Sequence, residues 1–335
     1  MLRFARSARL SSAFLLLASL TFLTACGADL GTPPIGKSDT AMTNDATAST
    51  TDADAAPAED SDVVGEVEEI ADGAAPEADA GSTTDEKALS LILTPPSINF
   101  DLTHWYLTLP SSAQIMPIEL NSGYQYADTF FTDTRTGGMS FRCPNIAGTT
   151  ANSTHSRTEL REMLNPTLST LSDLSNNWTI AQGGTMNAAV RIDHTSTTGT
   201  TNVGNVVIGQ IHGPHTEAMR LHFVKGPNDT TGRIFVAMEN VLGKGVHSPD
   251  LVSNATGDGI KLGERFTYQI RLYGTTLTVY IGRVNRPTVK YTATIDPGYA
   301  GLGLYFKAGV YNQDNTGDPA DYVQATFFKL THTHP

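Results

Sequence analysis

The chain has 335 residues, a formal net charge of −12 and only two cysteines. Most of the negative charge lies in residues 27–96, where 16 acidic residues face two lysines, so residues 97–335 carry a net charge of about −1. A positively charged surface over the whole molecule is therefore excluded, and a polyanion could bind only through a local basic cleft.

The first 25 residues have the pattern of a secretory signal peptide. Three arginines precede an apolar run over residues 13–22, which is well short of the ~20 residues that a transmembrane helix needs. Leu-Thr-Ala-Cys at residues 23–26 resembles the processing box of bacterial lipoproteins. This resemblance implies lipidation of Cys26, membrane attachment through that lipid anchor only, and export to the outer membrane or cell surface, with release into the medium as an alternative. An ordinary cleaved signal followed by a chance cysteine is the competing interpretation.

Residues 26–96 are expected to form the lipidated cysteine and a disordered acidic linker. The segment after Cys26 is rich in Ala, Asp, Glu and Thr and contains no aromatic residue. A segment of this composition cannot bury enough apolar surface to offset the entropy lost on ordering. Because Cys143 is the one other cysteine, no intramolecular disulfide is expected once Cys26 is lipidated.

Residues 97–335 are predicted to form one all-β domain. Short segments bounded by Gly, Pro, Asn, Asp and Thr recur without a βαβ rhythm, which indicates an antiparallel β-sandwich. The expected strands are 139–143, 157–162, 185–192, 206–212, 220–225, 233–238, 266–273, 277–281, 289–294, 304–311 and 323–330. Residues 124–132 and 166–174 lack sustained helical periodicity and are interpreted as short helices or loops.

Three of these strands place polar side chains on one face, because residues two apart in a strand share a face. The side chains that share these faces are Arg157, Glu159 and Arg161 in the first strand, Gln210 and His212 in the second, and Tyr305, Lys307, Tyr311 and Gln313 in the third. Gly309 is expected to leave room for a ligand against the third face. Each strand alone is more typical of an ordinary surface, so the combination carries the functional hypothesis.

The motifs RTELRE, QIH and YFKAGVYNQ, in this order, resemble the signature strands of polysaccharide lyase family seven, the alginate lyases. The resemblance extends to residues 101–110 and 148–153 and so covers essentially all of residues 97–335. His155-Ser156 departs from the aromatic and proline that members often have there. The resemblance implies a jelly-roll sandwich with a concave substrate groove, alginate as the partner, no nucleic acid, and a monomer. It also implies loops over the groove, for which residues 196–205, 242–259 and 312–321 are candidates.

The resemblance also implies roles for individual residues in cutting a uronate polymer by β-elimination. Arg157, Gln210 and His212 would neutralise the substrate carboxylate while its C5 proton is removed. Tyr311 would protonate the departing O4, and could also act as the base on mannuronate, whereas His212 is the natural base for guluronate. The remaining side chains on these faces are expected to bind or orient the substrate: Glu159, Arg161, Tyr305, Lys307 and Gln313. In this family, isoleucine in QIH tends to accompany activity on guluronate-containing blocks, so a preference for guluronate or mixed blocks is expected. Endolytic cleavage is expected as well.

No cofactor is expected, because His212, His215, His332 and His334 do not have a zinc-binding spacing. The acidic loop 314–321 does not by itself define a calcium site. Three other functions compete with an alginate lyase. A non-catalytic polyuronate-binding module would be expected to lack one of the catalytic residues. A glycoside hydrolase needs two facing carboxylates, and no Glu-x-Asp-x-x-Glu strand is found. A lyase for another polyuronate, such as glucuronan, would need the same chemistry.

Overall fold

The computed structural model describes residues 94–151, 153–167, 174–214, 216–254 and 257–335. The expected signal peptide, the lipidated Cys26 and nearly all of the expected linker lie outside the described residues. No described helix is both long and apolar enough to span a membrane.

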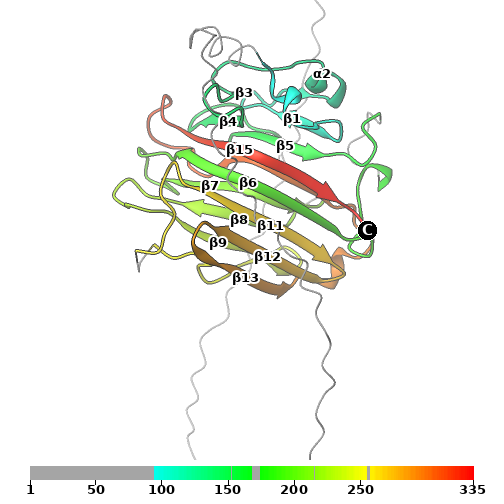
Figure 1. Ribbon diagram of the computed structural model, residues 1–335. Coiled ribbons are helices and arrows are strands. Elements are labelled where there is room, and N and C mark those ends of the chain that lie inside the picture. The colour runs from blue at the N-terminus through cyan, green and yellow to red at the C-terminus, as the bar shows by residue number, and fades with distance from the viewer. Residues whose placement is uncertain (1–93, 152, 168–173, 215, 255–256) are drawn as a thin grey trace, which may run out of the picture. The chain divides into compact units, whose positions relative to one another are not determined.

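Two antiparallel sheets pack together as a β-sandwich (Figure 1). The eight-stranded sheet has the order β10-β9-β8-β7-β14-β5-β1-β2, and the seven-stranded sheet has the order β13-β12-β11-β6-β15-β4-β3. The strands of the first sheet are β1 (Trp105–Thr108), β2 (Gln114–Ile115), β5 (Arg157–Glu162), β7 (Asn205–His212), β8 (Glu217–Val224), β9 (Arg233–Val241), β10 (Lys244–His247) and β14 (Tyr305–Asn312). The strands of the second sheet are β3 (Phe130–Thr132), β4 (Met139–Pro144), β6 (Gly184–His194), β11 (Arg265–Tyr273), β12 (Thr276–Arg283), β13 (Arg286–Thr294) and β15 (Tyr322–Thr333). The connections contain the short helix α2 (Pro117–Asn121) and the 3-10 turns η1 (Pro96–Ile98), η2 (Leu174–Asn176) and η3 (Pro297–Tyr299). The predicted all-β sandwich is confirmed.

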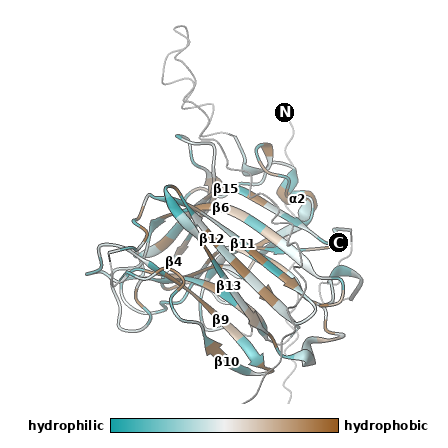
Figure 2. Cartoon of the chain, turned by 60° about the horizontal axis from the view of Figure 1, so that its bottom comes forward, coloured by the Kyte–Doolittle hydropathy of each residue, from teal (hydrophilic) through white to brown (hydrophobic). Residues whose placement is uncertain are grey.

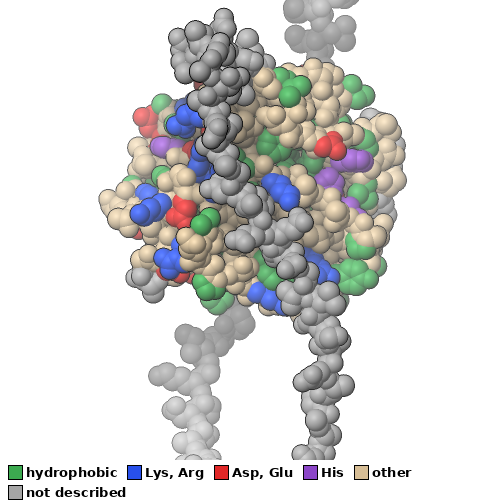
Figure 3. Space-filling model, in the orientation of Figure 1, with side chains coloured by type: hydrophobic (Ala, Val, Ile, Leu, Met, Phe, Trp, Pro, Cys, Tyr) green, Lys and Arg blue, Asp and Glu red, His purple; other side chains and the backbone are tan. Residues whose placement is uncertain are grey.

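The seven-stranded sheet has one face on the core and one face toward solvent. Buried and more exposed residues alternate along β6 and β11, and hydrophobic and hydrophilic residues alternate along the same strands in Figure 2. This is the period-2 pattern of a half-buried antiparallel strand. Acidic and basic side chains are dispersed over the face shown in Figure 3, in keeping with the small net charge of this part of the chain.

The core between the sheets is filled by aromatic and branched aliphatic side chains. Trp178 packs on Phe306 with ring centroids 5.0 Å apart, and Phe141 packs on Phe327 at 5.2 Å. The buried hydroxyl of Tyr268, on β11, donates a hydrogen bond of 2.8 Å to a backbone oxygen of β7. Burial of each such side chain stabilises the fold by roughly 1.5–3 kcal/mol, so the two sheets form a firm support for the strands that carry the site.

Strand β5 differs from the strands of the other sheet because all six of its residues are buried. Its even-numbered residues, such as the fully buried Leu160, face the core, and its odd-numbered residues face the opposite side of the sheet. Arg157 and Arg161 on that opposite side are only 8% and 3% exposed. Side chains of neighbouring strands therefore cover this face, which is unusual for arginine and indicates a built site.

Three local expectations from the sequence are wrong. Residues 124–132, expected as helix or loop, include strand β3, whose short length hides its alternation. The candidate loop at residues 242–259 includes β10, a four-residue edge strand whose Gly245 weakens the strand signal. Gly309 does not make room for a ligand: a Cβ there would lie 2.6 Å from the Thr158 carbonyl oxygen on β5, and its φ is +139°. Glycine is required at this position by the backbone and by the neighbouring strand.

Candidate active site

The three motifs lie on adjacent strands at the centre of the eight-stranded sheet, in the order β7-β14-β5. Paired residues on neighbouring antiparallel strands point to the same face. One row of such pairs crosses six strands and consists of Arg161, Lys307, Gln210, Arg220, Ala237 and His247. Because strands lie ~4.8 Å apart, the row covers about 24 Å. It forms a largely basic track at right angles to the strands.

Glu159 is the centre of this face. Its carboxylate lies 2.6 Å from Lys307 Nζ and accepts a hydrogen bond of 3.0 Å from Arg157 Nη1. It also accepts a hydrogen bond from the Gln210 side-chain amide. The residue is 1% exposed, so it cannot serve as a freely accessible nucleophile. Its position instead fixes one side chain from each of the three motif strands.

Tyr311 lies at one end of β14, directly opposite Arg157 on β5. The Arg157 guanidinium carbon is 3.8 Å from the centre of the Tyr311 ring, and the hydroxyl group is 3.0 Å from the Ser153 hydroxyl. The His155 ring packs at right angles to the Tyr311 ring, with ring centroids 6.2 Å apart. The residue that departs from the family pattern therefore contacts the candidate acid, which the spacing alone could not show.

His212 lies toward the other end of β14, opposite Tyr305. Its Nδ1 is 2.9 Å from the Tyr305 hydroxyl and 2.5 Å from the Gly213 carbonyl oxygen. Because a carbonyl oxygen only accepts hydrogen bonds, Nδ1 carries the proton and Nε2 has a free lone pair. The Arg161 guanidinium lies over the Tyr305 ring at 3.7 Å. The middle of β14 thus separates an imidazole at one end from a tyrosine and a cation at the other.

Burial and the local charges shift the pKa values of the central groups. Burial raises the pKa of Glu159, but Lys307 and Arg157 outweigh it and hold the pKa below its usual value. Burial lowers the pKa of Lys307 to about 8, despite the opposing effect of Glu159. Burial and the Lys307 charge lower the pKa of His212 to about 4, and burial raises that of Tyr305 to about 12. At neutral pH the site therefore holds a neutral imidazole beside fixed cations.

Two buried polar atoms of the site have no partner among the described residues: Arg157 Nε and Gln210 Oε1. Unsatisfied buried polar atoms are rare and costly, so they are typical of places where a ligand or water binds. Gln313, by contrast, directs its amide to the backbone oxygen of Tyr311 at 3.3 Å. It therefore shapes the end of β14 more directly than it lines the face.

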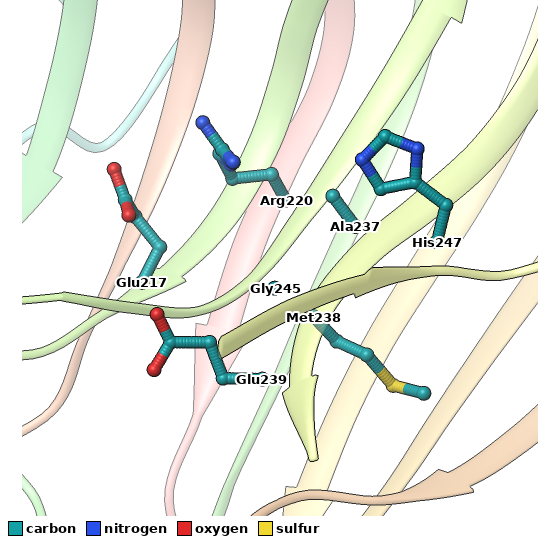
Figure 4. A pocket seen from close by; sticks show the side chains of 7 residues that line it. All are labelled: Glu217, Arg220, Ala237, Met238, Glu239, Gly245 and His247. Atoms are coloured by element: carbon teal, nitrogen blue, oxygen red, sulfur yellow. The ribbon is translucent and has the colours of Figure 1, made fainter. Parts of the chain in front are cut away.

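The sequence pattern did not reveal the part of the face that lies on β8, β9 and β10. A hollow beside the motif strands is lined by residues of these strands, and Figure 4 shows Arg220 between Glu217 and His247 in that view. Glu217 Oε1 lies 3.8 Å from His212 Nε2, which joins the hollow to the motif residues. The segment EAMRLHFV reads as an ordinary half-buried strand, and only its pairing with β7 reveals the role of Arg220 in the row.

Two of the loops expected over the groove are bound to each other. Backbone N–H groups of Thr197 and Thr198 donate hydrogen bonds of 2.7 and 2.8 Å to the Asp321 carboxylate. Thr200 also donates its backbone N–H to the Thr316 hydroxyl at 3.0 Å. The loops at residues 196–205 and 312–321 are therefore held together where β7 begins and β14 ends.

A sandwich face that combines cations, an amide, a neutral imidazole and tyrosines around an engaged carboxylate defines a polysaccharide lyase rather than a hydrolase with two free carboxylates. The family model for alginate lyases matches residues 100–334. An alginate lyase from Klebsiella pneumoniae is 38% identical over 280 residues, which cover 71% of this chain and 91% of that protein. The chain belongs to the alginate lyase family, as the three motifs indicated.

Solved structures agree with this assignment. The crystal structure of the alginate lyase from Klebsiella pneumoniae has a TM-score of 0.68 and 36% identity, covering 72% of this chain and 99% of that one. A crystal structure of the family 7 alginate lyase A1-II′ in complex with substrate (GGMG) has a TM-score of 0.58 and 29% identity, covering 72% of this chain and 97% of that one. The jelly-roll architecture expected from the motifs is therefore confirmed.

Proposed function

We propose that this chain cleaves alginate by β-elimination on the face formed by β5, β14 and β7. The observation that carries the proposal is the cluster in which Glu159 holds Arg157, Lys307 and Gln210 on three adjacent strands. Groups fixed in this way need little reorganisation when negative charge develops on a substrate carboxylate. A uronate with its carboxylate over Arg157 and Gln210 would have its ring above the middle of β14.

The proposed reaction needs one base and one acid. The base takes the C5 proton, the electron pair left on C5 forms the C4–C5 double bond, and the C4–O4 bond breaks. The acid then protonates O4 of the leaving chain. In guluronate the proton and the leaving group lie on opposite sides of the ring, which matches His212 and Tyr311 at opposite ends of β14. In mannuronate they lie on the same side, so Tyr311 would perform both transfers.

The state of His212 suits the role of base. The low pKa of His212, caused by burial and by Lys307, keeps it neutral, and its Nδ1 proton is turned toward Gly213, so Nε2 can accept a proton. Tyr311 suits the role of acid because a guanidinium lies over its ring and stabilises the phenolate that forms when the proton leaves. Tyr305, with its raised pKa, is proposed to orient His212.

We propose endolytic cleavage with a preference for guluronate or mixed blocks. The track of paired residues continues on both sides of β14, to Arg161 and to His247, so sugars could bind on both sides of the cut. Ile211, which motivates the block preference, is fully buried toward the core. Its influence would therefore be exerted through the position of Gln210 and His212 and not through contact with the sugar.

The first 26 residues support a further part of the proposal. The chain would be exported as a lipoprotein, held at the outer membrane or cell surface by Cys26, and would act as a monomer at the end of the acidic linker. Mass spectrometry of the membrane fraction, with a Cys26→Ser variant as the control, tests this part separately from the catalytic activity.

Ultraviolet absorbance of the unsaturated product tests the catalytic proposal. The full-length chain is incubated with polyguluronate, polymannuronate and glucuronan, and the product lengths are followed over time. We expect the fastest reaction on polyguluronate or mixed blocks, with long products appearing before short ones. Equal rates on polymannuronate would overturn the block preference, and monomers as the first products would overturn endolytic action. Binding without absorbance on any polymer would favour a non-catalytic binding module.

A further inference from the structure

A second cluster of titratable side chains lies away from the proposed active site. It joins Glu162, on the core face of β5, to His332 and His334 at the end of β15. The two histidines are two residues apart and so share one face of the chain. Figure 1 marks the C-terminus at one side of the sandwich, and Figure 3 shows a group of His side chains on that same side.

The geometry of the cluster is close to that of a metal site. His334 Nε2 lies 2.6 Å from Glu162 Oε1, and His332 Nε2 lies 3.4 Å from the same oxygen. One possible ligand atom from each residue lies within 4.8 Å of the others. Ligands around a tetrahedral zinc ion, each about 2.0–2.2 Å from the metal, lie about 3.3–3.6 Å apart. The His332 contact has this length, and the shorter His334 contact is a hydrogen bond that would lengthen when the metal replaces the shared proton.

Hydrogen bonds from outside the cluster orient two of the three side chains. His334 donates its Nδ1 proton to the Gly183 carbonyl oxygen at 2.8 Å, which leaves Nε2 as the ligand atom. Glu162 Oε2 accepts hydrogen bonds from Trp178 Nε1 at 2.9 Å and from the Phe306 backbone at 2.8 Å, so Oε1 is left for the histidines. Such outer hydrogen bonds, which fix the tautomer and the ring orientation, are typical of metal ligands.

Access from solvent is also suitable. The side chains of His332 and His334 are 16% and 18% exposed, so an ion and a water ligand can reach them from solvent. Trp105 packs edge-on against His332 with ring centroids 5.0 Å apart and restricts its movement.

We propose that Glu162, His332 and His334 bind one divalent transition-metal ion of the zinc type, with water completing the coordination. Two imidazoles and one carboxylate suit Zn²⁺, Cu²⁺ or Ni²⁺, whereas Ca²⁺ and Mg²⁺ prefer sites made of oxygen atoms. The proton that His334 shares with Glu162 would be released as the metal binds. The spacing of the histidines in the sequence did not predict this site, because its third ligand comes from the other sheet.

The position of the site gives the ion a structural role. Glu162 follows Arg161 on β5, and β15, the last strand in the sequence, lies inside the opposite sheet between β6 and β4. A metal bound by all three residues would join the C-terminal end of the chain to the strand that carries Arg157, Glu159 and Arg161. The site faces the core side of β5, so the ion would stabilise the sandwich without touching a substrate on the other face.

Titration with zinc tests the proposal on the full-length chain, prepared without a polyhistidine tag and freed of metal by a chelator. Calorimetry and thermal unfolding are measured with ZnCl₂, and with MgCl₂ and CaCl₂ as control salts. We expect saturable binding of one zinc ion per chain and a higher Tm with zinc only. X-ray absorption of the zinc-loaded chain should show only nitrogen and oxygen ligands at about 2.0–2.2 Å.

The variant His332→Gln separates a metal site from an ion pair. It removes one ligand but keeps the 2.6 Å contact between His334 and Glu162, so the metal-free Tm should stay near the wild-type value. Zinc affinity should fall more than tenfold, whereas His194→Gln, on β6, should bind zinc like the wild type. Absence of saturable zinc binding by the wild-type chain would overturn the proposal. Equal zinc affinity in His332→Gln and the wild type would overturn it as well. If a variant fails to fold, the titration of the wild-type chain still tests the proposal.

Discussion

Replacing Glu159 by glutamine tests the reasoning about the centre of the site. The change keeps the size of the side chain but removes the negative charge that faces Arg157 and Lys307 at 3.0 and 2.6 Å. Both cations are more than nine-tenths buried. Removal of one partner from a buried ion pair costs about 3–5 kcal/mol. For a domain of this size, that loss corresponds to a Tm lower by about 6–20 °C.

The same variant should also lose activity. Arg157 and Gln210 would no longer share a fixed anchor, and loss of one preorganised donor costs on the order of 10²–10³ in rate. The two side chains act as a unit, so the combined loss should stay near that range and not be its square. Lys307 would also lose the charge that supports its protonated form, so its pKa should fall below about 8.

Thermal unfolding and the ultraviolet assay measure the two effects of Glu159→Gln separately. Activity is measured well below the Tm of the variant, so that unfolding does not contribute to the loss. Glu119→Gln, which alters an exposed glutamate on α2, is the matched control and should leave Tm and rate unchanged. A Glu159→Gln variant with wild-type Tm and wild-type kcat/KM would refute the central role of this carboxylate.

Three further predictions concern residues on the strands that carry the site. Burial lowers the pKa of His212 to about 4 and that of Lys307 to about 8, so the imidazole is neutral above the first value and the ammonium is charged below the second. The pH profile of kcat/KM on polyguluronate should therefore be highest between these values. Lys307→Arg should move the fall of kcat/KM at alkaline pH to higher pH, and a fall at the same pH as in the wild type would contradict its assignment to Lys307. Arg220→Ala should raise KM about tenfold with kcat nearly unchanged, because a charged hydrogen bond to the polymer is lost in ground state and transition state alike; a fall in kcat at constant KM would speak against a binding role. Gly309→Ala should lower the free energy of unfolding by at least about 1–3 kcal/mol, the cost of its backbone conformation, since φ is +139° and a Cβ would meet β5. Urea unfolding measures this loss, with Gly245→Ala as the control, because a Cβ at Gly245 meets nothing within 4 Å. Equal effects of the two changes would refute the steric argument.

The sequence predicted the chemical faces well, because alternation along a strand is a local property. The strand at residues 157–162 has the predicted bounds, and Gln210 and His212 share a face as expected. Short strands were harder to find, since β3 has three residues and β10 has four, one of them Gly245. Their existence depends on pairing with a neighbouring strand, which no local pattern records.

Contacts between distant parts of the chain could not be predicted from spacing. The order β7-β14-β5 joins segments about 100 and 150 residues apart, and only this order brings Gln210 and Lys307 to Glu159. Arg220 was overlooked because its strand has an ordinary alternating pattern until the register with Gln210 is known. The cluster of Glu162 and the C-terminal histidines was not predicted for the same reason, since its proposed ligands come from two sheets.

The most direct test of the account is the rate of Tyr311→Phe on polyguluronate, followed by ultraviolet absorbance beside the wild-type chain. The change removes only the hydroxyl group that contacts Ser153, so the Arg157 contact, the Tm and the KM should be nearly preserved. Loss of a general acid should lower kcat on the order of 10²–10⁴. A variant that keeps the wild-type kcat would contradict the claim that this face, with Tyr311 as its acid, performs the elimination.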